Sequence, residues 1–231
     1  MKKKKIAAKP IAVDTLTLPE ICNMFKKSVG IAYPKSKGAI SKELKHISRM
    51  GRSYHKWIKT YEEYIGAKIS FYLQKTPHFK EAKQNIGMTC RTKKGLILVT
   101  TINIGAPACY KEFIYDDKWS PEFMIYSAHF CERFAERILK VENPTFQIGS
   151  EALMFNELLG IIRVVEKFDN GLERIEIQYQ SGQAYGIYDP KNKITFLNTI
   201  YSDDMLKHHR LEFKMDYEPA LIQLFEKTVI R

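Results

Sequence analysis

Residues 161–200 read IIRVVEKFDNGLERIEIQYQSGQAYGIYDPKNKITFLNTI and contain four short runs of strand-forming residues separated by turn signals. The turns fall at Asn170-Gly171, at Ser181-Gly182 and at 189–192 (DPKN), because these residue types adopt turn conformations readily. Residues 172–180 (LERIEIQYQ) alternate apolar and polar side chains, as a half-buried strand does. The pattern predicts an antiparallel meander with strands at 161–168, 172–180, 183–188 and 193–200.

Helices are predicted before and after this meander in the sequence. Residues 150–159 (SEALMFNELL) begin with a serine that suits a helix cap, and residues 128–141 follow Ser127 and end before Asn143-Pro144. Two closing helices are expected after the meander, at 202–209 and 218–229. Farther upstream, 95–104 (GLILVTTINI) has the β-branched apolar character of a buried strand, with a second strand expected at 110–115.

The N-terminal half has a different pattern. Apolar residues recur at spacings of three, four and seven from Ile40 to Ile65, which predicts a long amphipathic helix from Ser41 to Gly66. Residues 67–86 fit helix or strand, and residues 1–38 lack a sustained period apart from a short helix at 19–27. The predicted fold class is therefore α+β, with an N-terminal long amphipathic helix followed by helices packed on an antiparallel meander sheet.

This pattern also predicts the domain organisation. We expect a flexible basic arm over 1–38, a helical and strand region over 39–120, and an α+β domain over 121–231. One continuous domain over 39–231 is the alternative, because the total of 231 residues suits one large domain or two small ones.

Positive charge is concentrated at the N-terminus. Residues 1–60 hold 15 lysines and arginines against three acids, although the whole chain has a formal charge of only +11. In the predicted helix, six cations lie opposite the apolar face, and they are Lys42, Lys45, Arg49, Arg52, Lys56 and Lys59. Such a basic stripe predicts contact with nucleic acid, although a solvated helix face would look the same.

Several classes of site and location are disfavoured. The four cysteines form no CxxC pair and have no ligand spacing with histidine, and adjacent His208 and His209 point about 100° apart on a helix. We therefore expect no metal site and no cofactor. The apolar run that follows the first lysines is too short for the core of a signal peptide. No apolar segment of the sequence is long enough to span a membrane. A cytoplasmic protein without membrane contact is predicted.

Candidate chemistry lies in 127–137, SAHFCERFAER. At helical pitch His129, Arg133 and Arg137 form one row, one turn apart. Ser127 as the cap would place His129 in the first turn, where the helix dipole favours the neutral imidazole and attracts anions. Such a row could bind a phosphate and move a proton, or it could be a solvated face paired with Glu132 and Glu136.

This helix, followed by the meander and its Thr-rich last strand, resembles the ribonuclease-toxin fold that groups barnase, EndoU, colicin nucleases and RelE. SAHFCERFAERI is similar to the His-x-x-x-Arg-x-x-x-Arg helix of RelE-like bacterial and phage proteins, over about residues 125–205. The resemblance implies metal-independent RNA cleavage, with His129 as base or acid and Arg133 and Arg137 on the phosphate. It further implies Tyr185 and Thr199 as second proton donor or phosphate contact.

Two functions therefore compete. The first is an RNA-binding protein, with RNA preferred over DNA, that acts as a metal-independent endoribonuclease of toxin or phage and mobile-element type. The second is a non-enzymatic nucleic-acid-binding or assembly protein that uses the basic N-terminal helix. An antitoxin protein is a partner implied by the resemblance, and the apolar helix face allows a homo-oligomer.

Overall fold

A computed structural model describes residues 16–64, 67–78, 82–102, 122–155, 160–179 and 181–208. Its helices are α1 (Leu18–Arg49), α3 (Ala128–Arg137), α4 (Phe146–Phe155) and α5 (Asp203–His208). Its strands are β1 (His55–Tyr64), β2 (Ala67–Lys75), β3 (Lys83–Thr92), β4 (Gly95–Ile102), β5 (Glu122–Ser127), β6 (Gly160–Lys167), β7 (Glu173–Tyr179), β8 (Gly182–Asp189) and β9 (Ile194–Ser202). The architecture confirms the predicted α+β class.

All nine described strands belong to one sheet, in the order β1-β2-β3-β4-β5-β9-β8-β7-β6. Every neighbouring pair is antiparallel except β5 and β9, which run parallel from Phe123 opposite Ile194 to Tyr126 opposite Leu197. The sheet thus joins two antiparallel meanders through one parallel pair. It crosses residue 121, where the sequence placed the start of a second region.

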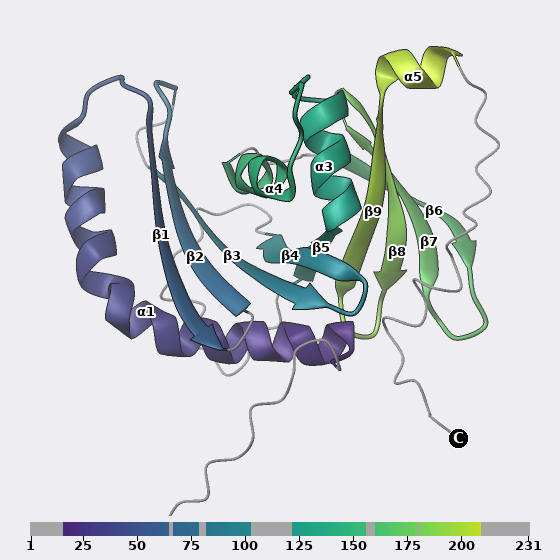
Figure 1. The fold of residues 1–231 in the computed structure, drawn as a ribbon, viewed down its shortest axis with the longest axis horizontal. Helices are drawn as coiled ribbons and strands as arrows, with labels where there is room; N and C mark the ends of the chain where they lie inside the picture. Colours follow the sequence, from purple (N-terminus) through teal and green to yellow (C-terminus); the bar gives the residue numbers. More distant parts are fainter. Residues whose placement is uncertain are drawn as a thin grey trace, which may run out of the picture.

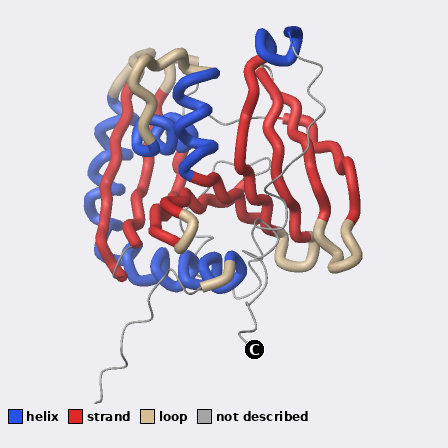
Figure 2. Tube along the Cα trace, turned by 45° about the vertical axis from the view of Figure 1, so that its right-hand side comes forward, coloured by secondary structure: helices blue, strands red, loops and turns tan. Residues whose placement is uncertain are grey.

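The sheet curves around α3 and α4, and α1 covers its other face (Figures 1 and 2). One apolar core lies between α1 and the sheet, with Phe25, Phe71 and Phe196 among its buried members. A second core joins α3 and α4 to the sheet through residues such as Phe130 and Phe134. Both sheet faces therefore carry an apolar layer, as a sheet covered on two sides requires.

The long N-terminal helix exists, but its predicted bounds of Ser41 to Gly66 are wrong. α1 begins at Leu18 because Thr17 and Glu20 form a reciprocal capping box, and it ends at Arg49. Pro34 lies inside α1 without ending it, and α1 is bent along its length, as helices with an internal proline often are (Figure 1). Residues 18–38, expected in a flexible arm, are thus helical. None of the described helices has an apolar stretch long enough to cross a bilayer.

Residues 55–64 form strand β1 and not the second half of that helix. Trp57 and Tyr61 pack against the core beneath α1, whereas Ile58 and Thr60 face the α4 side of the sheet. This alternation follows the period of two that a strand imposes. β2 and β3 resolve the ambiguity of 67–86 in favour of strand for most of that segment.

The second half follows the sequence prediction closely. The four meander strands are β6 to β9, each within two residues of its expected ends, and α3 begins directly after Ser127. α4 begins four residues before the predicted start at Ser150. The predictions for 1–15, 110–115 and 218–229 lie outside the described residues, as does His209.

Candidate functional site

α3 is positioned by its cap and by its apolar face. The hydroxyl of Ser127 accepts a hydrogen bond from the backbone N–H of Phe130 at 3.0 Å, which confirms the predicted cap. Phe130 and Phe134 are fully buried and fix the rotation of the helix. The row of His129, Arg133 and Arg137 consequently flanks the buried face and does not belong to it.

α4 holds α3 in place through a very close contact. Gly149 of α4 lies against the backbone carbonyl of Cys131, and a Cβ atom at residue 149 would collide with that oxygen. Only glycine allows the two helices to approach this closely. The position of the row on α3 therefore depends on a residue of α4.

α3 also completes the edge of β9. Pairing between β5 and β9 ends at Leu197, so within the described residues the next carbonyl groups of β9 have no strand beside them on that side. The hydroxyl of Ser127 donates to the carbonyl oxygen of Asn198 at 3.1 Å, and Nη1 of Arg137 donates to that of Ile200 at 2.7 Å. The two ends of α3 thus supply the donors that a neighbouring strand would have supplied.

Arg137 also contacts a group of polar and aromatic residues on β8 and β9. Its guanidinium carbon lies 4.5 Å from the ring centroid of Tyr201, a cation–π contact. The Tyr201 ring meets that of Tyr185 edge to face, with centroids 5.9 Å apart. Tyr185 is opposite Thr199 in the β8–β9 register, so the structure brings three of the five predicted catalytic residues together around Tyr201.

Tyr185 and Thr199 do not face α3, although they lie on the paired strands β8 and β9. Ala184 and Ile200 belong to the core beneath α3, and neighbouring residues of a strand point to opposite faces. Tyr185, Thr199 and Tyr201 therefore share the other face, and Arg137 reaches them past the open edge of β9.

Burial shapes the chemistry of this group. Tyr185 is buried, and desolvation followed by the charge of Glu176 raises its pKa to about 12. The phenol therefore remains protonated near neutral pH and cannot act as a base there. Oγ1 of Thr199 is also buried and has no hydrogen-bond partner within the described part of the chain. An unpaired buried hydroxyl costs free energy unless a ligand or water pairs with it.

His129 and Arg133 are more exposed than Arg137. Partial desolvation, followed by the charges of Arg133 and Arg137, lowers the pKa of His129 below its ordinary value. The neutral imidazole predicted for this position is therefore favoured, through burial and two arginines in addition to the helix dipole. Arg133 forms an ion pair with Glu136, which confirms part of the alternative that acids of the same helix pair with the row.

The predicted basic stripe is divided, because its six members do not share one helix. Lys42, Lys45 and Arg49 are exposed on the last turns of α1, and Arg52 is exposed in the connection to β1. Nζ of Lys59 lies 5.9 Å from the ring centroid of Tyr61, on the α1 side. Nζ of Lys56 instead lies 4.5 Å from the ring centroid of Phe155 in α4.

The stripe also lies far from the α3 row. Five strand steps separate β1 from β9 in the sheet, or about 24 Å measured along it. α1 and α3 cover opposite faces of the sheet (Figure 1). The structure therefore does not bring the two predicted sites together.

A cavity of about 470 Å³ lies between α4 and the first four strands, on the face opposite α1. Its floor is polar, since Oγ1 of Thr60 and Oγ of Ser70 share a hydrogen bond of 2.8 Å there. Lys68, Arg91 and Glu151 provide its charges. None of these five residues was singled out from the sequence, because they come from four separate elements.

Tyr201 was also missed by sequence reasoning. Its strand was expected to end at Ile200, two residues before the observed end at Ser202, although Thr199 and Tyr201 are two apart and so share a face. The contact with Arg137 depends on the parallel pairing of β5 with β9, which no local pattern reveals.

A scan against protein-family models, a search of curated proteins and a search of solved structures each found no match.

Proposed function

We propose that the chain binds single-stranded RNA at the seam between α3 and β9, defined by His129, Arg133, Arg137, Thr199 and Tyr201, and cleaves it without a metal ion. The observation that carries the proposal is the fixed position of Arg137 between the Ile200 carbonyl and the Tyr201 ring. Arginine binds phosphate through two parallel hydrogen bonds, and a fixed guanidinium loses little further freedom on binding. The resemblance of this helix to RelE-like ribonucleases points to the same chemistry.

Each reacting residue of the seam has its own role in the proposed reaction. The neutral imidazole of His129 takes the proton of the 2′-hydroxyl while the 2′-oxygen forms its bond to phosphorus. Arg133 and Arg137 stabilise the negative charge that builds on the phosphorane oxygens. The bond from phosphorus to the 5′-oxygen then breaks, and that oxygen takes a proton from the phenol of Tyr201.

Tyr201 replaces Tyr185 in this scheme for a structural reason. Tyr201 is half-buried and touches Arg137 directly, whereas Tyr185 is buried behind it. Tyr185 then acts as a positioning residue that holds the Tyr201 ring. Thr199 has its unpaired hydroxyl on the same face, but that oxygen is buried, so we assign Thr199 no direct contact with the phosphate.

A cleavage assay on a single-stranded RNA, in the presence of EDTA, tests the proposal. Wild type should release a product that ends in a 2′,3′-cyclic phosphate, and His129→Ala should cleave at least about 100-fold more slowly. His78→Ala is the matched control, since His78 is an exposed histidine in the turn after β2. Equal cleavage by wild type and His129→Ala would remove His129 from the mechanism, and loss of all cleavage in EDTA would contradict a metal-free reaction.

The non-enzymatic alternative is favoured by a separate observation. Lys42, Lys45, Arg49 and Arg52 are exposed together around the end of α1, where they can contact a polyanion without any of the seam residues. RNA binding that survives Arg137→Ala, with no cleavage by wild type, would support this alternative over the seam.

A further inference from the structure

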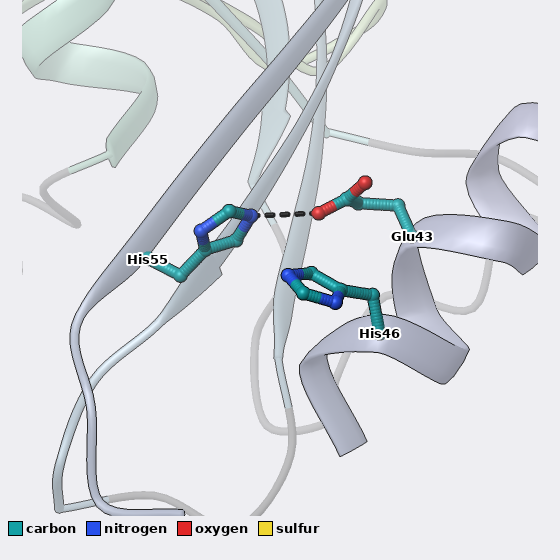
Figure 3. A group of neighbouring side chains, drawn as sticks. All are labelled: Glu43, His46 and His55. Carbon is teal, nitrogen blue, oxygen red and sulfur yellow. Dashed lines mark hydrogen bonds and ion pairs between the residues drawn. The ribbon is translucent and has the colours of Figure 1, made fainter. Parts of the chain in front are cut away.

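A second group of chemically reactive side chains lies where α1 meets β1. Glu43 and His46 are three residues apart near the end of α1 and so share one face of the helix. His55 is the first residue of β1, and all three side chains converge (Figure 3). A continuous helix over 41–66 would have separated the α-carbons of His46 and His55 by about 13.5 Å, so the true end of α1 creates the cluster.

The distances suit ligands of one metal ion. Nε2 of His55 lies 2.6 Å from Oε1 of Glu43, and the two imidazole rings are 5.6 Å apart at their centroids. One ligand atom from each residue lies within 4.8 Å of the others. Ligands placed about 2.1 Å from a zinc ion lie about 3.4 Å apart in a tetrahedron. Small side-chain rotations bring the three atoms to that spacing.

The identity of the ligands selects the metal. Two imidazoles and one carboxylate are a known set for zinc and for other divalent transition metals, whereas magnesium and calcium prefer oxygen ligands throughout. The nearby cations Lys42, Lys45 and Arg49 oppose the binding of any cation. A metal held there must therefore gain its affinity from the imidazole nitrogens.

We propose that Glu43, His46 and His55 bind a divalent transition metal of the zinc class, in a site whose fourth position is open to solvent. The openness follows from the exposure of His46 and the partial exposure of the other two residues. The ion would join the end of α1 to the start of β1 across the connection that contains Arg52. It would therefore fix the geometry of the exposed cations around it, in addition to binding a ligand at its open position.

Zinc uptake by the full chain, made metal-free by dialysis, tests the site in a calorimeter. Wild type should bind one equivalent of Zn²⁺ more than His46→Ala does, and His78→Ala should bind as much as wild type. Counting the difference removes zinc that binds at other histidines. His46 is exposed, so its replacement by alanine leaves the core intact. Mg²⁺ should give no binding heat at this site.

Two further variants define the ligand set. His55→Ala and Glu43→Gln should each weaken zinc binding at this site by at least about tenfold. Zn²⁺ should also raise the melting temperature of wild type but not of His46→Ala, because a ligand that binds only the folded chain stabilises it. Equal uptake by wild type and His46→Ala would overturn the proposal and leave Glu43 and His55 as a hydrogen-bonded pair. No RNA is present, so the result does not depend on the proposed RNA site.

Discussion

Two regions of the molecule present positive charge in opposite ways. One is the β1 edge, by which we mean the last turns of α1 and the adjoining start of β1, and the other is the seam between α3 and β9. At the β1 edge, Lys42, Lys45 and Arg49 are exposed on α1. At the seam, Arg137 is held by a backbone carbonyl and by the Tyr201 ring. Exposed cations attract a polyanion without orienting it, whereas a fixed guanidinium orients one phosphate. Attraction and orientation of a polyanion are therefore assigned to separate regions of this chain, about 24 Å apart along the sheet.

The largest loss of stability should come from disrupting the contact between α4 and α3, which holds the seam in place. Gly149→Ala places a Cβ against the Cys131 carbonyl, and because backbone must move to relieve the collision, we expect a loss of about 3 kcal/mol in the free energy of unfolding. Urea unfolding measures this loss. Gly38→Ala is the matched control, because Gly38 has open space in α1 and alanine should stabilise the helix by about 0.5–1 kcal/mol. Equal stabilities for the two variants would contradict the close α3–α4 contact.

The two seam arginines should differ in stability but agree in function. Arg137→Ala removes a charged hydrogen bond to Ile200 and should cost about 1.5–3 kcal/mol in the free energy of unfolding. Arg133→Ala removes an exposed ion pair with Glu136 and should change it by less than about 0.5 kcal/mol. Both variants should bind RNA more weakly than wild type. Wild-type RNA affinity in either variant would show that its guanidinium does not hold phosphate.

Neutralising the β1 edge should change the salt dependence of RNA binding. Replacing Lys42, Lys45 and Arg49 by glutamine should flatten the plot of log affinity against log salt by about 2, if all three contact phosphates of a single strand. A triple variant of exposed lysines elsewhere, at 27, 93 and 191, is the matched control. The catalytic rate at saturating RNA should not change in either variant. An unchanged salt slope would exclude the α1 cations from the RNA interface.

The smallest effect should be a dependence of stability on pH at the seam. The pKa of His129 is lowered in the folded chain, so the unfolded chain takes up a proton first as the pH falls. The contribution of His129 is therefore full above its unfolded pKa of about 6.5 and declines below it. Unfolding free energies of wild type and His129→Gln, measured from pH 7.5 to pH 5, should diverge in this range. Parallel curves would place His129 in free solvent.

The quality of prediction from sequence differs between the same two regions. Around the seam, the turn signals at Asn170-Gly171 and Ser181-Gly182 are local, so four strands were predicted from adjacent residues alone. The cap at Ser127 is local as well, and the row on α3 followed from it. Tyr201 was missed because its contact with Arg137 depends on which strands pair across the sheet.

At the β1 edge the sequence misled for a physical reason. Trp57 and Tyr61 are four residues apart, a spacing that fits one face of a helix and also one face of a strand. The helical spacing of apolar residues in α1 therefore continues into β1, and the spacing alone does not mark where the helix ends. Gly51 was the overlooked signal for the end of the helix, as Thr17 and Glu20 were for its start. The cluster of Glu43, His46 and His55 was hidden by the same error.

Hydrogen–deuterium exchange on the protein bound to RNA tests the central claim most directly. The RNA should carry 2′-O-methyl groups, which block the attacking hydroxyl, so that it binds without being cleaved. The proposed seam predicts that RNA slows exchange in α3 and at the end of β9, around residues 128–137 and 198–202. Protection confined to the end of α1 and the start of β1, with α3 unchanged, would contradict it.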